Sequence, residues 1–246
     1  MGRASDEQIK TREKYSQNKN TNDKIFIILM IIFLISSFFT FQSSITKAEN
    51  STDDDSVIAS PVQKELVGKI PYSESINGND VIITKLATYQ IAGRVVEEYD
   101  YSTGVAGIVQ TIASKEYYND ISPKDVAIAY GPMALAENHK KVNYIMSGSR
   151  RVIYSVKDDS LLDDFGSLQT IGKYITNNHL IATDPKVLNL MKKIDKDDYV
   201  QITGYLVRVD WVKGIYRYAL ESSLLRDDTG SRACEVILVE DIKWIK

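Results

Sequence analysis

The sequence is poor in the residues from which disulfide frameworks, metal cages and nucleic-acid-binding surfaces are built. Its 246 residues include one cysteine and two histidines, which excludes an internal disulfide and a cysteine-based zinc cage. Thirty basic and thirty-three acidic side chains give a net charge of −3, so nucleic acid is not an expected partner. We also expect no metal and no cofactor.

One long apolar run stands out in a composition that is otherwise ordinary for a folded domain, with 43% hydrophobic and 26% charged residues. The run begins at Ile25, ends at Phe41 and carries no charge. As a helix it would be about 26 Å long, close to the roughly 30 Å of a bilayer's hydrocarbon core. Basic residues are more numerous before the run than directly after it. This asymmetry predicts a single-pass protein of the bacterial inner (cytoplasmic) membrane, with the N-terminus in the cytoplasm.

A cleaved signal peptide is the alternative to a retained anchor, because Thr46-Lys47-Ala48 places small residues where a signal peptidase reads them. The long leader and the length of the apolar run favour retention. We therefore expect four segments: a cytoplasmic tail over residues 1–24, a transmembrane signal anchor over 25–45, a flexible tether over 46–79, and an extracytoplasmic globular domain over 80–246.

The globular part combines predicted strands with a few predicted helices. β-Branched and aromatic residues predict strands over residues 85–96, 151–156, 199–209, 215–221 and 233–239. Ser122-Pro123 and Asp184-Pro185 each predict the start of a helix, since Ser and Asp cap helices and Pro fits the first helical position. Gly204 lies inside a long predicted strand and favours a bend there. The expected fold is α+β, with a strongly bent antiparallel sheet or a small OB-like barrel with inserted helices, preceded by one transmembrane helix.

Five motifs occur in order along this part of the chain. They are Ser122-Pro-Lys-Asp125 with Tyr130-Gly-Pro-Met133, Asn178-His-Leu-Ile181, Asp197-Asp-Tyr-Val-Gln-Ile-Thr-Gly204, Ser222-Ser-Leu-Leu-Arg-Asp-Asp-Thr-Gly230 and Ala233-Cys-Glu235. Together they resemble a family of uncharacterised bacterial exported or single-pass membrane proteins, over about residues 85–245. The chain departs from that family at Asp197, where a glycine is usual, and at Arg232, where a glycine is common. The resemblance implies domain boundaries and implies no activity.

A serine hydrolase is one reading of the chemistry-bearing residues. His179 titrates near neutral pH and could act as a general base for Ser222 or Ser223. No Gly-x-Ser-x-Gly motif supports this reading. A buried histidine and a turn at the Ser222 motif are the simpler interpretation.

Cys234 is the second candidate nucleophile. Arg232 lies two residues before it and would share its face of a strand, and a thiolate needs a cationic neighbour. The apolar surroundings of Cys234 instead favour an inert, buried thiol.

A ligand-binding OB-type module is the third reading, because aromatic side chains on such a barrel can stack on ligands. Its candidate binding residues are Tyr199, Tyr205, Tyr216, Tyr218 and Arg226. Since no catalytic motif stands out, the sequence favours a non-enzymatic, membrane-tethered module that binds a protein partner or assembles in the cell envelope.

Overall fold

The computed structural model describes residues 59–102, 116–147, 150–225 and 234–245. The chain divides into two units, Met1–Asp53 and Asp54–Lys246, and the described residues all belong to the second. The predicted tail, the predicted anchor, residues 46–58 of the predicted tether and Arg226 lie outside the described residues, whereas the rest of the predicted tether contains two strands, Val62–Glu65 and Tyr72–Ile76. Within the described ranges, no helix is both long enough and apolar enough to cross a bilayer.

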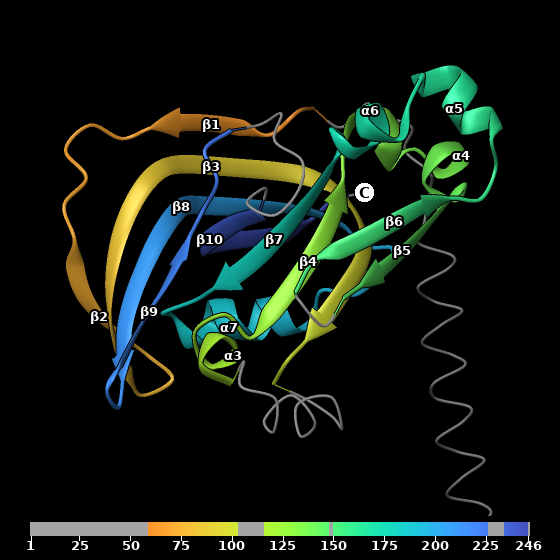
Figure 1. Cartoon of the computed structure of the whole chain (residues 1–246). Helices are drawn as coiled ribbons and strands as arrows, with labels where there is room; N and C mark the ends of the chain where they lie inside the picture. Colours follow the sequence, from red (N-terminus) through yellow and green to blue (C-terminus); the bar gives the residue numbers. More distant parts are fainter. Residues whose placement is uncertain (1–58, 103–115, 148–149, 226–233, 246) are drawn as a thin grey trace, which may run out of the picture. The chain divides into compact units, whose positions relative to one another are not determined.

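Five strands of an eight-stranded sheet pair in a closed ring, whose order is β3, β4, β7, β10 and β8 (Figure 1). Their bounds are Asn79–Asp100, Lys124–Ala129, Ile175–Ile181, Cys234–Trp244 and Tyr199–Lys213. The β7–β10 pairing is parallel and the other four pairings are antiparallel. Irregularities of register interrupt the pairings of β3 with β8 and with β4. Such bulges increase local bending and twist, and the sheet is strongly bent, as the sequence predicts.

The remaining strands extend the ring or lie beside it. β1 (Val62–Glu65) and β2 (Tyr72–Ile76) pair with β3, and β9 (Tyr216–Glu221) pairs with β8. A separate hairpin is formed by β5 (Val142–Met146) and β6 (Val152–Val156). The predicted strands over 151–156, 199–209 and 215–221 are thereby confirmed, with small differences at their ends.

Short helices connect the strands, and their bounds are Glu116–Ile121 for α3, Gly131–Ala134 for the 3₁₀ helix η1, Ala136–His139 for α4, Ser160–Phe165 for α5, Leu168–Gly172 for α6 and Pro185–Lys192 for α7. The sequence predicts α7 correctly. Its N-cap, Asp184, accepts a hydrogen bond from the backbone N–H of Lys186 at 2.7 Å, and Val187 and Met191 are buried. Thus α7, which follows β7 and precedes β8 in the chain, packs its apolar face against the core of the ring.

The prediction that a helix begins at Ser122-Pro123 is wrong. Residues 124–129 form β4, and all six are buried. A strand that is buried along its whole length does not alternate between apolar and polar residues, so its pattern cannot be distinguished from that of a buried helix. Trp244, near the end of β10, is 41% exposed, and its indole N–H donates to Asp198 at 2.9 Å.

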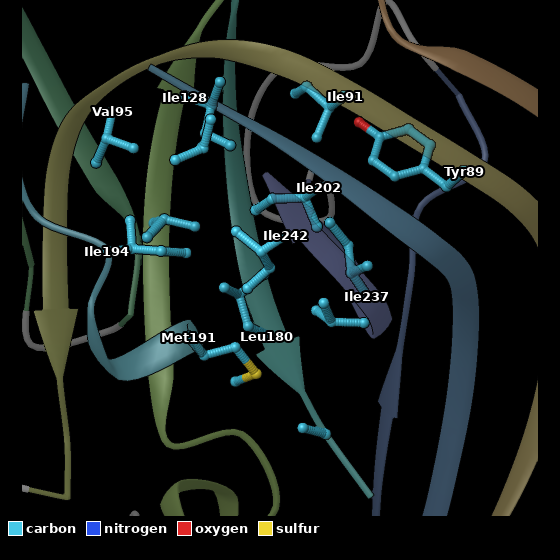
Figure 2. Packing of buried hydrophobic residues seen from close by; sticks show 14 of the residues in the cluster. Tyr89, Ile91, Val95, Ile128, Leu180, Met191, Ile194, Ile202, Ile237 and Ile242 are labelled. Atoms are coloured by element: carbon cyan, nitrogen blue, oxygen red, sulfur yellow. The ribbon is translucent and has the colours of Figure 1, made fainter. Parts of the chain in front are cut away.

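The main core fills the ring, where aliphatic side chains from all five strands and from α7 meet (Figure 2). Gly204 of β8 is required by a close approach to β10. A Cβ atom at this position would lie 2.1 Å from the carbonyl oxygen of Leu238, well inside van der Waals contact. The sequence predicts a bend at this glycine, and the structure shows that a glycine is needed here because the backbones of the paired strands β8 and β10 approach closely.

Candidate functional site

A fully buried carboxylate, Asp125 of β4, lies at the centre of a polar cluster beside the ring. Arg150 binds it with two hydrogen bonds, from Nη2 to Oδ1 at 2.6 Å and from Nε to Oδ2 at 3.0 Å. The hydroxyl of Tyr101 donates to Oδ2 at 3.1 Å. Nδ1 of His179 lies 2.8 Å from Oδ1. Burial alone would raise the pKa of Asp125, but His179 and Arg150 hold this pKa below its ordinary value, so the carboxylate is ionised at neutral pH.

The strand register explains why Asp125 and His179 meet. They are directly opposite each other in the antiparallel pairing of β4 with β7, which places their side chains on the same face. Arg150 reaches them from the turn between β5 and β6, where its φ of +63° is uncommon for a residue with a side chain. It also donates to the carbonyl oxygen of Ser122 at 2.6 Å, which ties the hairpin to the start of β4.

His179 is buried, as the sequence predicts, with 8% of its surface exposed. Burial lowers the pKa of His179. The charge and hydrogen bond of Asp125 raise this pKa by more, and an interaction with the Cys234 side chain raises it further, so that it reaches about 9. His179 is therefore an imidazolium at neutral pH. Because Asp125 occupies Nδ1, Nε2 is the ring nitrogen that remains for the thiol.

Cys234, the first residue of β10, is only partly buried. It pairs with Asn177 in the parallel β7–β10 ladder, and the Asn177 amide N–H lies 3.4 Å from its sulfur. The same amide group donates to the carbonyl oxygen of Arg150 at 3.2 Å. A hydrogen bond thus joins Asp125 of β4 to His179 of β7, and Cys234 of β10 lies on the next strand, opposite the residue two positions before His179.

The two candidate serines bind backbone groups. The hydroxyl of Ser222 donates to the carbonyl oxygen of Ser223 at 3.0 Å and accepts from the N–H of Val236 at 3.1 Å. The hydroxyl of Ser223 accepts from the N–H of Leu225 at 3.1 Å. Among the described residues, the side-chain hydrogen-bond partner of His179 is Asp125 rather than either serine.

The four candidate tyrosines lie on β8 and β9 and have different local partners. Tyr199 packs under Arg94, with 4.3 Å from the guanidinium carbon to the ring centroid, and donates to Ala134. Tyr205 lies under the ammonium group of Lys85 at 3.6 Å. Tyr216 and Tyr218 lie close together, and Tyr218 stacks on Trp211 with ring centroids 5.5 Å apart. Each ring therefore has its own local packing partner.

Sequence reasoning missed Asp125, Arg150 and Tyr101 as members of a site. One signal could have identified Asp125: it precedes the apolar run 126–129, and a carboxylate beside such a run needs a buried partner. Among the described residues, no group of three or more His, Cys, Asp or Glu side chains is placed to hold a metal ion. A scan against protein-family models and searches of curated proteins and of solved structures gave no match.

Proposed function

We propose that the globular domain is a cysteine-dependent acyl-transfer enzyme. Cys234 is the nucleophile, His179 transfers the proton, and Asp125 orients the imidazole. The observation that carries this assignment is that a fully buried carboxylate, an imidazolium bonded to it and a partly exposed thiol lie on the three neighbouring strands β4, β7 and β10. A nucleophile, a base and a group that orients the base are the elements shared by catalytic triads on unrelated folds.

The charges in the cluster favour a nucleophilic role for the sulfur of Cys234. Arg150 and His179 are cations, and within the described part of the chain Asp125 is the anion that contacts both. These two cations would stabilise negative charge that develops on the sulfur of Cys234 during the reaction. The Asn177 amide N–H, 3.4 Å from the sulfur, would further stabilise negative charge there. Nucleophilic cysteines in proteins lie in electropositive, partly exposed surroundings of this kind.

The proposed reaction is hydrolysis of an acyl compound in two steps. The Cys234 thiolate attacks the carbonyl carbon, a C–S bond forms, and the leaving group departs with the proton from Nε2 of His179. The neutral imidazole then takes a proton from water, and the resulting hydroxide attacks the thioester. The carboxylic acid leaves, and the thiolate–imidazolium pair is restored. Asp125 stays ionised and keeps Nδ1 of the ring oriented throughout.

The arrangement of the ring favours an OB-type barrel, which we propose as the finer description of the fold. Support comes from five strands in a closed ring, one parallel pairing, and α7 between β7 and β8. OB barrels bind ligands on their second and third strands and the neighbouring loops. These strands correspond here to β4 and β7, which carry Asp125 and His179. The cluster therefore lies where such a barrel would bind a substrate.

We retain the membrane anchor over residues 25–45 as part of the proposal, since the basic leader and the uncharged run support it. The enzyme would then act outside the bacterial inner membrane on a substrate of the cell envelope. The sequence alone favours a binding or assembly module because it shows no nucleophile paired with a base. The cluster supplies that pair and favours catalysis.

Alkylation of Cys234 tests the proposal directly, because it is the only cysteine in the chain. The full chain in nonionic detergent is treated with iodoacetamide at neutral pH, and modification is followed by mass spectrometry. We expect Cys234 to react faster than N-acetylcysteine and His179→Gln to slow the reaction by about tenfold or more. Thermal unfolding of the variant confirms that it is folded.

Acylation by p-nitrophenyl acetate tests the covalent step. We expect an acetyl group on Cys234, its loss in Cys234→Ser, and no change in the matched control Ser223→Ala. Acylation that depends on Ser223 instead would favour the serine hydrolase. Alkylation at the rate of N-acetylcysteine in both wild type and His179→Gln, together with no acylation, would refute an enzymatic role.

A further inference from the structure

A loop that leaves the edge of the sheet between β1 and β2 has no role in the proposed reaction. Both strands pair with the edge of β3 that β8 does not occupy, and the last residue of β1 is opposite Ala87 while the first of β2 is opposite Ile83. Residues 66–71 therefore face only residues 84–86 of β3. The surplus chain has to leave the sheet, and Figure 1 shows it looping away from β3 at one end of the domain.

The projecting loop exposes two aliphatic side chains. Val67 is fully exposed and Ile70 is 78% exposed. Between them, Gly68 has a φ of +72°, and a Cβ atom at this position would meet nothing within 4 Å. The base of the loop is fixed, because the N–H of Leu66 donates to the carbonyl oxygen of Leu86 at 3.0 Å. Single exposed aliphatic residues are ordinary on protein surfaces, whereas two at the tip of one projecting loop indicate a contact with an apolar partner.

Basic side chains flank the two aliphatic ones. Over residues 62–71 the chain carries Lys64 and Lys69, with Glu65 as its one acidic residue. Lys69 lies 3.6 Å from Glu65, so the segment keeps one positive charge in excess. Basic residues next to a membrane are attracted to anionic lipid headgroups, and apolar side chains gain free energy on leaving water. A loop of this composition fits an anionic bilayer surface.

The position of the loop in the chain brings such a surface close to it. The predicted anchor ends at residue 45, and β1 begins at Val62. As a flexible chain, which their composition predicts, residues 46–61 would span about 22 Å. A tether of that span holds the loop near the bilayer at a high effective concentration, whereas a soluble partner has to be captured from solution. The bilayer is therefore the apolar partner that we assign to the loop.

We propose that the loop over residues 66–71 inserts Val67 and Ile70 into the outer leaflet of the membrane that holds the anchor, with Lys64 and Lys69 beside anionic headgroups. Anchor and loop together would hold the domain in one orientation on the membrane, because two attachment points remove the freedom to turn that a tether alone leaves. The inference rests on the proposed anchor and is independent of the chemistry at Cys234.

Quenching by spin-labelled lipid tests the insertion in the full chain. Cys234→Ser removes the only cysteine, and an NBD fluorophore is attached to Ile70→Cys in that background. The protein is reconstituted in vesicles of phosphatidylcholine and phosphatidylglycerol that contain a lipid with a nitroxide near its headgroup. We expect quenching about twofold or more stronger than at Ile145→Cys, because an interfacial apolar group is buried about 5–10 Å into the headgroup and acyl boundary. Ile145 is the matched control, an exposed aliphatic residue of the β5–β6 hairpin.

A second substitution shows whether the native loop or the fluorophore drives the insertion. Val67→Asp, combined with the label at Ile70→Cys, should lower the quenching to the level of the control, because a charged side chain is costly to move out of water. Ile153→Asp, an exposed position on β6, is its matched control and should leave the quenching unchanged. Strong quenching that Val67→Asp does not lower would overturn the proposal.

Flotation of the vesicles after washing with alkaline carbonate separates a failure of the anchor from a failure of the loop. Chain that floats with the vesicles, with equal quenching at Ile70→Cys and Ile145→Cys, would overturn the insertion and leave the anchor standing. Chain released by carbonate would overturn the anchor and the insertion with it. A fluorophore at Ile70→Cys that is shielded from water without being quenched would show that a second copy of the chain covers the loop, which also overturns the insertion.

Discussion

The raised pKa of His179 makes the stability of the domain depend on pH in a defined window. The pKa of this residue is 6.5 in its ordinary state and about 9 in the folded chain. Since the folded state holds the proton more tightly, the stabilisation is complete below about pH 6.5 and is lost as the pH rises through about 9. Replacing His179 with glutamine removes this titration.

The magnitude follows from the change in pKa. A rise from 6.5 to about 9 corresponds to about 3 kcal/mol of unfolding free energy, at about 1.4 kcal/mol per pH unit. Glutamine keeps a polar side chain of similar size but cannot carry the charge that pairs with Asp125. The difference in unfolding free energy between wild type and His179→Gln should therefore be about 3 kcal/mol larger at pH 6 than at pH 10.

Urea unfolding of the full chain in nonionic detergent, followed by tryptophan fluorescence, measures this difference. Comparing wild type with His179→Gln at each pH removes the titration of lysines and tyrosines elsewhere. His139→Gln is the matched control, because the pKa of His139 is lowered to about 4. The stabilisation from a neutral His139 is present above about pH 6.5 and is lost as the pH falls towards 4, so this variant should change only the acid side of the profile.

A difference between wild type and His179→Gln that stays constant from about pH 6 to about pH 10 would refute the reasoning. It would mean that His179 is not held as an imidazolium by Asp125. The proposed thiolate–imidazolium pair would then lose its electrostatic basis, even with the contacts unchanged.

Two further predictions concern the fold and the membrane. Gly204→Ala should destabilise the domain by about 3 kcal/mol or more, since the new Cβ would lie 2.1 Å from the carbonyl oxygen of Leu238; a loss below about 1 kcal/mol in urea unfolding would contradict the close approach of β8 and β10. Protease added outside intact spheroplasts should degrade the globular domain, because basic residues lie ahead of the apolar run; protection of that domain would reverse the orientation, and a mature N-terminus at Glu49 would show a cleaved signal.

Local patterns predicted the elements that have one buried and one exposed face. In β8, buried residues such as Val200 and Ile202 alternate with partly exposed ones, so the pattern alone identifies a strand. The cap at Asp184 and the spacing of Val187 and Met191 identify α7. β4 was not predictable in this way, because it is buried on both faces and Ser122-Pro123 imitates a helix start.

The sequence by itself determined the class of the fold, the positions of five of the ten described strands and the burial of His179, because these depend on hydrophobic periodicity and on capping within short segments. Only the tertiary structure decided which side chains form the site. Asp125 lies 54 residues from His179 in the chain, and Arg150 lies 25 residues from Asp125. Their contacts arise from the β4–β7 register and from the β5–β6 turn, and pairing between distant strands leaves no local signal in the residues that it joins.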